Sequence, residues 1–307
     1  TPTKSNGEID LSQIENVTSN LLSNINGYKL IVIKSTLPIT AVNIMKEQLS
    51  KKYKQGRDYD IVSNPEFLRE GRAVFDFYNP DRIVIGGETK KSIDILKDFY
   101  SPLIKNKVNV PDEIIVNKDD VPIIETNLPS AQMIKYGSNA FLANKVSFIN
   151  EIAQICEKVG ANINDVIYGM GIDPRIGSNY MQPGPGFGGP CLEKDLMALV
   201  ELGNFYDLES TFMKAILKRN ERQVELILDK ITSEIKQAGS LITVLGLSFK
   251  ANTDDIRNSA SIKLITLLLK KGYKVNSYDP KAKYSLQNEN YLQLNVQCGQ
   301  DLYLLKI

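Results

Sequence analysis

One cysteine stands at the end of a glycine-rich loop and is followed directly by charged residues. Residues 184–195 have the sequence Gly-Pro-Gly-Phe-Gly-Gly-Pro-Cys-Leu-Glu-Lys-Asp, in which the cysteine is Cys191. Glycines let backbone N–H groups approach a ligand closely, and Lys194 and Asp195 follow Cys191 at the spacing of one helical face. The pattern predicts a nucleophilic thiol presented to a ligand. A flexible loop before a helix, carrying an ordinary thiol, is the alternative interpretation.

The composition limits the chemistry that this thiol can take part in. The 307 residues include no histidine, which excludes Ser-His-Asp and Cys-His mechanisms and leaves no imidazole for a metal. Acid–base steps must therefore use Lys, Asp, Glu or Tyr. Cys156, Cys191 and Cys298 are far apart and odd in number, which fits neither a disulfide framework nor a zinc site. We predict no metal site and a reducing, cytoplasmic location.

The charge balance argues against nucleic-acid and membrane partners. The chain has 37 basic and 36 acidic residues, a net charge of +1, and therefore no polybasic footprint. It contains no secretory signal and no apolar run of the length that crosses a bilayer. We expect neither nucleic acid nor membrane among the partners.

The first part of the chain alternates predicted strands with predicted helices. Apolar runs predict strands at residues 29–34, 59–63, 82–86 and 113–116, with helices at about 40–53 and 90–104. This rhythm is typical of a mostly parallel sheet, on which ligands bind beyond the carboxyl ends of the strands.

Polar turns follow two of these predicted strands, at residues 35–38 and 63–70. Both turns also suit plain loop chemistry. The second favours function, because Glu66 and Glu70 lie four residues apart and would bring like charges together at some cost on a helix.

A helical pattern covers about residues 128–159, and it sets Lys135 and Asn139 on one face beside apolar residues. The alternative for Lys135 is that it merely extends to solvent from an apolar stripe. A second long helical pattern, at about residues 208–237, has apolar residues spread widely enough to suggest two buried faces. We predict this second helix as a possible dimer spine.

The last part of the chain contains a second βαβ pattern. Strands at 241–246 and 273–278 flank a helix at about 259–271 that stops at Gly272. The turn after the first of these strands carries Lys250 and Arg257, which suit phosphate oxygens, although a solvated loop explains them equally well.

Taken together and in order, these segments resemble the UDP-glucose/GDP-mannose dehydrogenase family. The matching pieces are residues 35–38, 64–71, 135–141, 150–151, the Cys191 loop and 246–259. The resemblance implies an α/β fold of two Rossmann-like domains joined by a long-helix central domain. It divides the chain into an NAD-binding remainder at 1–126, a helical central and dimerisation domain at 127–238, and a UDP-sugar-binding domain at 239–307.

The resemblance also implies an activity, the four-electron oxidation of the C6 alcohol of UDP-glucose by two NAD⁺ through a cysteine thioester. Another nucleotide sugar, GDP-mannose or a UDP-N-acetylhexosamine, is an alternative substrate. An inactive nucleotide-sugar-binding fragment is a further alternative, and so is a cysteine acyl-transfer enzyme that uses no nicotinamide. The implied partners are the nucleotide sugar and a second copy of the chain, bound through the long central helix.

Roles of single residues are implied by the same resemblance. Cys191 is the nucleophile, Lys135 and Asn139 stabilise the developing oxyanion, and Lys135 also moves the hydroxyl proton. Asp195, Thr36 and Glu70 order the hydrolytic water, and Glu66 supports the site. The implied substrate-binding residues are Lys135 and Asn139 together with Phe67, Leu68, Arg69, Phe187, Gly188, Phe249 and Lys250. Those implied for NAD are Thr36, Glu70, Lys194 and Arg257.

The chain departs from the family pattern in three places. It begins at Thr1 after the fourth strand of the family's NAD-binding domain, so we expect the half with the G-x-G-x-x-G turn to be absent and NAD to bind poorly or not at all. Residues 287–307 do not follow the family's usual ending, and the last domain is expected to be incomplete. Pro190 and Glu193 replace the residues expected beside Cys191 and Lys194, which bears on sugar preference.

Overall fold

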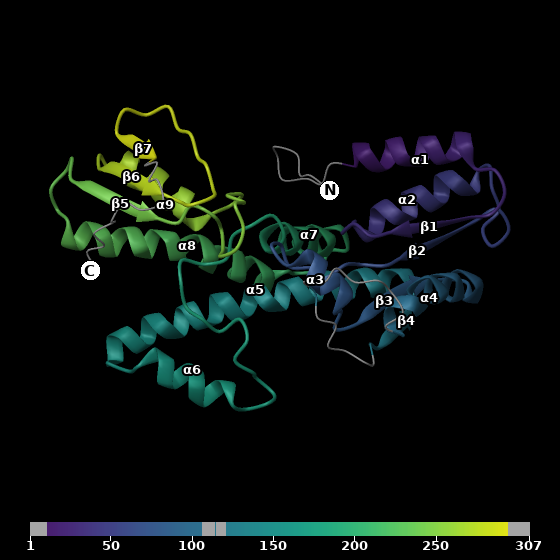
Figure 1. Ribbon diagram of the computed structural model, residues 1–307, viewed down its shortest axis with the longest axis horizontal. Helices are drawn as coiled ribbons and strands as arrows, with labels where there is room; N and C mark the ends of the chain where they lie inside the picture. The colour runs from purple at the N-terminus through teal and green to yellow at the C-terminus, as the bar shows by residue number, and fades with distance from the viewer. Residues whose placement is uncertain (1–10, 106–113, 115–120, 294–307) are drawn as a thin grey trace. The chain divides into compact units, whose positions relative to one another are not determined.

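The computed structural model describes residues 11–105, 114 and 121–293 (Figure 1). The chain forms two compact units, of which the first combines Thr1–Asn139 with Met197–Leu208 and the second combines Ala140–Leu196 with Glu209–Ile307. The division expected from the resemblance, at residues 126 and 238, stays a prediction. We describe the two units separately.

The sheet of the first unit has the strand order β1-β2-β3-β4. Its strands are β1 (Lys29–Ile33), β2 (Tyr59–Ser63), β3 (Ile83–Gly87) and β4 (Ile123–Thr126). The β1–β2 and β3–β4 pairs are parallel, with Lys29 opposite Tyr59 and Ile83 opposite Ile123. The central β2–β3 pair is antiparallel and short, and joins Val62 to Gly87 and Ser63 to Gly86.

The predicted strands at 29–34, 59–63 and 82–86 are confirmed, and β2 and β3 are buried along their whole length, as expected inside an α/β layer. The mostly parallel sheet is confirmed in two of its three pairings, and the antiparallel β2–β3 junction corrects the expectation for the third. The predicted strand at 113–116 lies outside the described residues except for Ile114, and β4 was not predicted because it is short and half-exposed.

Helices cover this sheet through two apolar cores. Helix α2 (Ile39–Ser50) packs with β1 and β2, and α1 (Ser12–Asn24) lies along α2 (Figure 1). Helix α4 (Lys90–Ile104), predicted with the same bounds, packs against β2 and β3, and begins at a Thr89 side chain that accepts a hydrogen bond from the Ser92 N–H. The short helix α3 (Ala73–Tyr78) follows the turn after β2.

The helical pattern at 128–159 is confirmed by α5 (Leu128–Val159). It is followed by α6 (Ile163–Gly171), α7 (Leu192–Phe205) and α8 (Thr211–Glu234). The buried residues of α8 are Ile216, Asn220, Val224 and Leu228. They form one stripe at a spacing of four residues. The expectation of a second buried face on this helix was tied to a dimer and stays a prediction.

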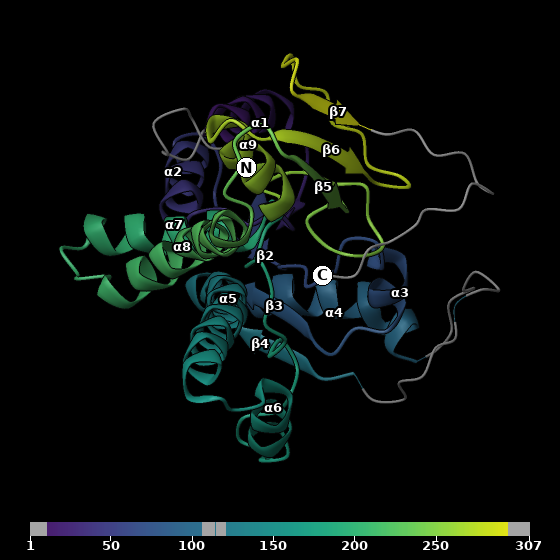
Figure 2. The same ribbon diagram turned by 90° about the vertical axis from the view of Figure 1, so that its left-hand side faces the viewer.

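The second unit carries a parallel sheet of β5 (Leu241–Leu245), β6 (Lys274–Tyr278) and β7 (Tyr291–Gln293), shown from another side in Figure 2. Helix α9 (Ala260–Lys270) connects β5 to β6, which confirms the predicted βαβ unit, and α8 packs against α9. Leu247, Ile265, Leu268 and Val275 are at the centre of its core. Strand β7 lies within residues 287–307, of which residues 294–307 lie outside the described part, as does Cys298.

Across the described residues, the search for long, apolar helices finds none that would span a membrane.

Candidate functional site

Lys135 of α5 is buried against the turn that follows β2. Only 6% of Lys135 is exposed, and its Nζ donates to the backbone carbonyl of Glu66 at 2.7 Å and lies 3.4 Å from Glu66 Oε1. The ammonium also lies 5.4 Å from the centre of the Phe67 ring. The interpretation of Lys135 as a residue extending to solvent is therefore wrong. The structure instead brings together three residues that the sequence assigned to one site.

Residues 64–69 form an irregular turn fixed by the buried amide of Asn64. Its Nδ2 donates to the Val84 carbonyl at 2.7 Å, while its Oδ1 accepts from the Tyr100 hydroxyl at 2.6 Å and from Lys34 Nζ at 3.0 Å. Because the turn is not helical, Glu66 and Glu70 do not face each other as i,i+4 neighbours, and that argument for function does not apply.

Lys34 belongs to this network although the sequence analysis did not select it. Its ammonium donates to the Tyr100 hydroxyl at 3.2 Å as well as to Asn64. Burial lowers the pKa of Lys34, against an opposing effect of the Glu66 carboxylate, and burial raises the pKa of Tyr100. The available signal was its position at the carboxyl end of the first strand, where ligands of such sheets bind.

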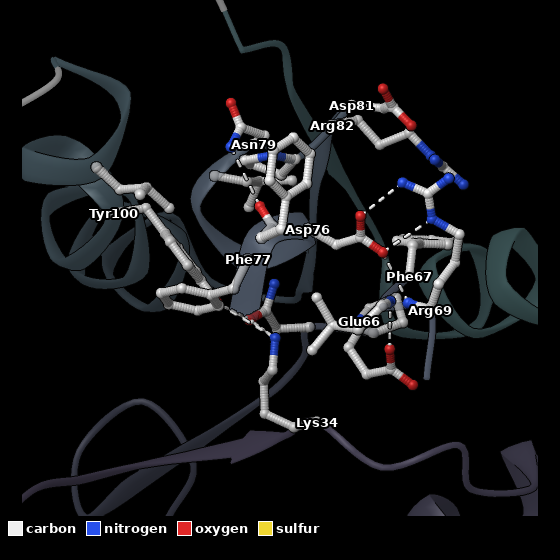
Figure 3. Close-up of a pocket in the computed structure, with 17 residues that line it drawn as sticks. Lys34, Glu66, Phe67, Arg69, Asp76, Phe77, Asn79, Asp81, Arg82 and Tyr100 are labelled. Atoms are coloured by element: carbon white, nitrogen blue, oxygen red, sulfur yellow. Dashed lines mark hydrogen bonds and ion pairs between the residues drawn. The ribbon is translucent and has the colours of Figure 1, made fainter. Parts of the chain in front are cut away.

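A cavity of about 280 Å³ lies beside the turn (Figure 3). Its lining includes Lys34, Phe67, Asp76 and Arg82. Arg69 reaches across to Asp76 and donates to both carboxylate oxygens, through Nε at 2.9 Å and Nη2 at 2.6 Å (Figure 3). The Arg69 guanidinium holds the pKa of Asp76 below its ordinary value despite the burial of that carboxyl. The Arg82 guanidinium stacks on Phe67, 3.7 Å from the ring centre.

The other predicted residues of the first unit lie on the expected elements. Asn139 is buried on α5, four residues after Lys135 and on the same face. Thr36 follows β1 and Glu70 ends the irregular turn, and both are half-buried. Neither lines the 280 Å³ cavity, whereas Phe67, Leu68 and Arg69 do.

In the second unit, Cys191 is exposed immediately before the first residue of α7. The Asp195 N–H donates to the Cys191 carbonyl at 3.0 Å, which makes Cys191 the N-cap residue of α7. The Asp195 side chain is only 1% exposed and accepts from Lys194 Nζ at 2.6 Å. The predicted thiol, cation and carboxylate are therefore gathered in the first turn of one helix.

The loop before Cys191 is anchored at three points along its length. The Phe187 N–H donates to Asn220 Oδ1 at 2.8 Å and the Phe187 carbonyl accepts from Asn220 Nδ2 at 2.9 Å. Gly184 is held by Asn150 and by Gln223, and the Gly189 N–H donates to the Arg257 carbonyl at 3.0 Å. These contacts favour an ordered loop over the flexible loop of the alternative interpretation.

Two of the loop glycines are required by close neighbours. A Cβ on Gly188 would lie 2.6 Å from the Asn258 carbonyl oxygen, and a Cβ on Gly189, where φ is +80°, would lie 2.6 Å from the Phe249 ring. The predicted residues Phe187, Gly188 and Phe249 are thus brought together, although Phe187 itself is buried.

The loop after β5 carries the predicted phosphate ligands. Lys250 Nζ lies 5.5 Å from the centre of the Phe249 ring, and the Arg257 guanidinium forms an ion pair with Asp255. Asp279 fixes the start of this loop by accepting from the N–H groups of Leu247 at 2.8 Å and Ser248 at 3.2 Å. Asp279 was not predicted as a site residue from the sequence, although the Asp-Pro pair at the end of a predicted strand is a turn signal.

Three models of one family match successive parts of the chain. The NAD binding domain of the UDP-glucose/GDP-mannose dehydrogenase family matches residues 1–104, its central domain matches residues 129–222, and its UDP binding domain matches residues 243–304. The fold and the order of these matches define an α/β protein of the dehydrogenase class. The chain belongs to the UDP-glucose/GDP-mannose dehydrogenase family.

Curated relatives agree with the family models. The chain is 42% identical over 301 residues to the UDP-glucose 6-dehydrogenase of Rickettsia bellii, covering 96% of this chain and 66% of the relative. It is 40% identical to a UDP-glucose 6-dehydrogenase of Bacillus subtilis, covering 92% of this chain and 58% of the relative. The chain thus spans slightly less than two thirds of the length of these relatives.

A solved structure carries the same fold. The UDP-glucose dehydrogenase from Pyrobaculum islandicum matches with a TM-score of 0.85 and 32% sequence identity, over 96% of this chain and 66% of that one.

Proposed function

We propose that this protein oxidises the C6 alcohol of UDP-glucose to the carboxylate in two NAD⁺-dependent steps, of which the second yields a thioester on Cys191 that water hydrolyses. The observation that carries the proposal is the exposed Cys191 at the start of α7, on an anchored glycine loop and one turn from a buried Asp195. Relatives named UDP-glucose 6-dehydrogenase, about 40% identical over most of the chain, support the choice of sugar nucleotide.

The cysteine accounts for the second oxidation. The Cys191 sulfur attacks the C6 aldehyde, an S–C bond forms, and the carbonyl oxygen becomes the hydroxyl of a thiohemiacetal. Loss of hydride from C6 and of the hydroxyl proton leaves a thioester. Water then adds to the thioester carbon, the S–C bond breaks, and the uronate and the thiol are released. With no histidine in the chain, the proton transfers fall to carboxylates and lysine.

The buried polar residues of the first unit suit the charge that develops on the sugar oxygen. Lys135 and Asn139 are buried donors on one face of α5, where a fixed cation stabilises an oxyanion more strongly than it does in water. We assign them that role, with Lys135 also moving the hydroxyl proton. Glu66 orients Lys135 through its backbone carbonyl, and Thr36, Glu70 and Asp195 are assigned to the water that hydrolyses the thioester.

NAD accepts the hydride in both steps when it is bound. The residues present fit part of an NAD site, because the first unit has a mostly parallel sheet, and Thr36 follows the carboxyl end of β1 where dinucleotides bind on such sheets. Thr36 and Glu70 would hold it from this unit. We assign Lys194 and Arg257 to the same cofactor, and Phe67, Leu68, Arg69, Phe187, Gly188, Phe249 and Lys250 to the nucleotide sugar.

We also propose that the protein is a homodimer and that the contact runs along α5 rather than α8. Phe141, Phe148 and Ile155 repeat at intervals of seven residues on α5, and their exposed fractions are 63%, 44% and 53%. A stripe of this kind is the seam that a second helix covers. On α8 the only large apolar residue among the described exposed ones is Phe212. A Phe148→Asp variant that still sediments as the parent oligomer would refute this surface.

The activity is tested by NADH absorbance with UDP-glucose and NAD⁺, using the full-length protein and its Cys191→Ser variant. Two NADH per sugar from the parent, and turnover reduced by at least ~10³-fold in the variant, are expected. The Cys156→Ser variant is the matched control, because that thiol is buried and has no assigned role. NADH with GDP-mannose or a UDP-N-acetylhexosamine alone would change the substrate and keep the chemistry. No NADH with any of them would leave a nucleotide-sugar-binding protein, and thioester turnover without NAD would leave an acyl-transfer enzyme.

A further inference from the structure

Asn220 of α8 has a buried side-chain amide. Both the oxygen and the nitrogen of this amide hydrogen-bond to the backbone of one residue, Phe187. Asn220 Oδ1 accepts from the Phe187 N–H at 2.8 Å and Asn220 Nδ2 donates to the Phe187 carbonyl at 2.9 Å. Asn220 is 7% exposed and Phe187 is also 7% exposed, so both bonds are shielded from water. A two-bond amide clamp of this kind fixes the position and the orientation of a peptide group.

The neighbouring glycine shows how closely the clamp fits. Gly186 has φ of +101°, and a Cβ at this position would lie 2.5 Å from Asn220 Oδ1. Only glycine can therefore adopt this backbone conformation and also leave room for the side-chain oxygen of Asn220. The loop and the asparagine are matched to each other.

A second pair of side chains holds the beginning of the loop. The Gly184 N–H donates to Asn150 Oδ1 at 2.8 Å, and the Gly184 carbonyl accepts from Gln223 Nε2 at 2.7 Å. Asn150 is on α5 and 2% exposed, whereas Gln223 is on α8, three residues after Asn220. Side chains at this spacing lie on the same face of a helix, so α8 holds the loop at two successive points.

Apolar packing does not replace these bonds at Gly184. A cavity of about 360 Å³ borders the loop there, and its lining includes Asn150, Cys156, Gly184, Pro185 and Gln223. On the side that borders this cavity, the loop is not packed against other side chains. Hydrogen bonds therefore define its position there. Gln223 Oε1 makes no hydrogen bond. This side chain therefore holds the loop through the single bond from its Nε2 to the Gly184 carbonyl.

We propose that Asn220, with Gln223 and Asn150, is a positioning residue for the thiol of Cys191. The three amides fix residues 184–187, and the chain then runs through Gly189, itself held by the Arg257 carbonyl, to Cys191 at the start of α7. The proposal rests on the function proposed above in so far as Cys191 is the nucleophile. In this proposal the clamp acts on Cys191 through the loop backbone.

Amide hydrogen exchange tests the clamp without requiring turnover. In Asn220→Ala, exchange in peptides that cover residues 184–190 should accelerate at least ~10-fold, as expected for the loss of a buried bond, while β6 exchanges as in the parent. Glu221→Ala changes an exposed neighbour on α8 and is the matched control. Should Asn220→Ala fail to fold, Asn150→Ala, which removes the acceptor of the Gly184 N–H, gives the same test at residue 184. Unchanged exchange in the loop of a folded variant would overturn the proposal.

Kinetics of the full-length protein supply the second measurement. A nucleophile displaced by about 1 Å loses on the order of 100-fold in rate, so kcat of Asn220→Ala should fall ~10- to 100-fold while KM for NAD stays within ~2-fold. Asn220→Asp, which keeps the acceptor for the Phe187 N–H, should recover part of kcat. A folded variant with faster loop exchange and parental kcat would refute the positioning role. An inactive parent would refute the proposed function and leave the exchange result to decide on the clamp.

Discussion

The ammonium of Lys135 donates to the backbone carbonyl of Glu66 at 2.7 Å, and this bond joins the long helix α5 to the turn that follows β2. It explains how a lysine that is only 6% exposed is accommodated, since its ammonium donates to this carbonyl and forms an ion pair with Glu66 Oε1 at the longer distance of 3.4 Å. The same carbonyl fixes the ammonium in one position, which is what a charge-stabilising residue requires.

Replacement of Lys135 by Met should abolish most of the turnover and leave the fold intact. Methionine keeps the apolar stem but removes the donor, so kcat of the full-length protein should fall by at least ~100-fold. Lys158→Met, at an exposed position on the same helix, is the control. Steady-state NADH formation, with circular dichroism to verify folding, measures the effect. A Lys135→Met enzyme that turns over within ~3-fold of the parent would show that Lys135 has only a structural role.

Gly189→Ala should destabilise the second unit. The new Cβ would lie 2.6 Å from the Phe249 ring at a φ of +80°, a conformation that costs an L-residue about 1–2 kcal/mol before the clash is counted. We expect a lower urea midpoint for Gly189→Ala and turnover that falls with it. Gly184→Ala meets no heavy atom within 4 Å and should unfold close to the parent midpoint. Equal midpoints for the two variants would contradict the assigned contact.

Asp279→Asn should destabilise the sheet of the second unit by about 2 kcal/mol at pH 7. The two Asp279 oxygens accept from Leu247 and Ser248 on one side and from Lys281 and Ala282 on the other, and an amide NH₂ would confront two of these donors. Urea unfolding measures the difference, and Asp254→Asn, at an exposed position, is the control.

The same aspartate gives a pH dependence of known sign. Burial raises the pKa of Asp279, but hydrogen bonds from the four backbone N–H groups outweigh it and hold the pKa below its ordinary value of 3.8. The unfolded chain therefore binds the proton first as pH falls. The stabilisation by Asp279 is complete above pH ~3.8 and is lost as pH drops through the lower, folded-state pKa. The gap between parent and Asp279→Asn midpoints should hold from pH 7 to 5 and narrow near pH 3. A gap that widens on acidification would contradict this assignment.

Helices and strands whose apolar residues repeat with a clear period were predictable from the sequence. Helix α5 carries a long apolar stripe and α4 ends where its pattern ends, and both were predicted with the bounds that the structure shows. Strand β4 has only four residues and is half-exposed, so its short pattern gave no periodic signal. The antiparallel junction of β2 and β3 also has no local signature, because pairing direction is set by tertiary contacts.

The residues of the candidate site could be predicted from their types and spacing, whereas most of the contacts between them could not. Cys191, Lys135 and Asn139 were selected from the sequence, and the structure shows that Cys191 is exposed whereas Lys135 and Asn139 are buried. Asn220 was not selected, because an asparagine inside a helical pattern is most often a solvated residue. Its role depends on a loop 33 positions earlier in the chain, and the periodicity of a helix gives no information about a partner so distant in sequence.

The short junction between β2 and β3 has a mechanical consequence. Two residue pairs, Val62 with Gly87 and Ser63 with Gly86, join two parallel pairs of strands that each have four or five paired residues. Side chains also brace this seam, because Asn64 Nδ2 donates to the Val84 carbonyl, and Glu88, directly after β3, accepts from Lys46 and Gln55. Under a force applied across the strands, the sheet should part at the seam first. Each half would keep its own ladder.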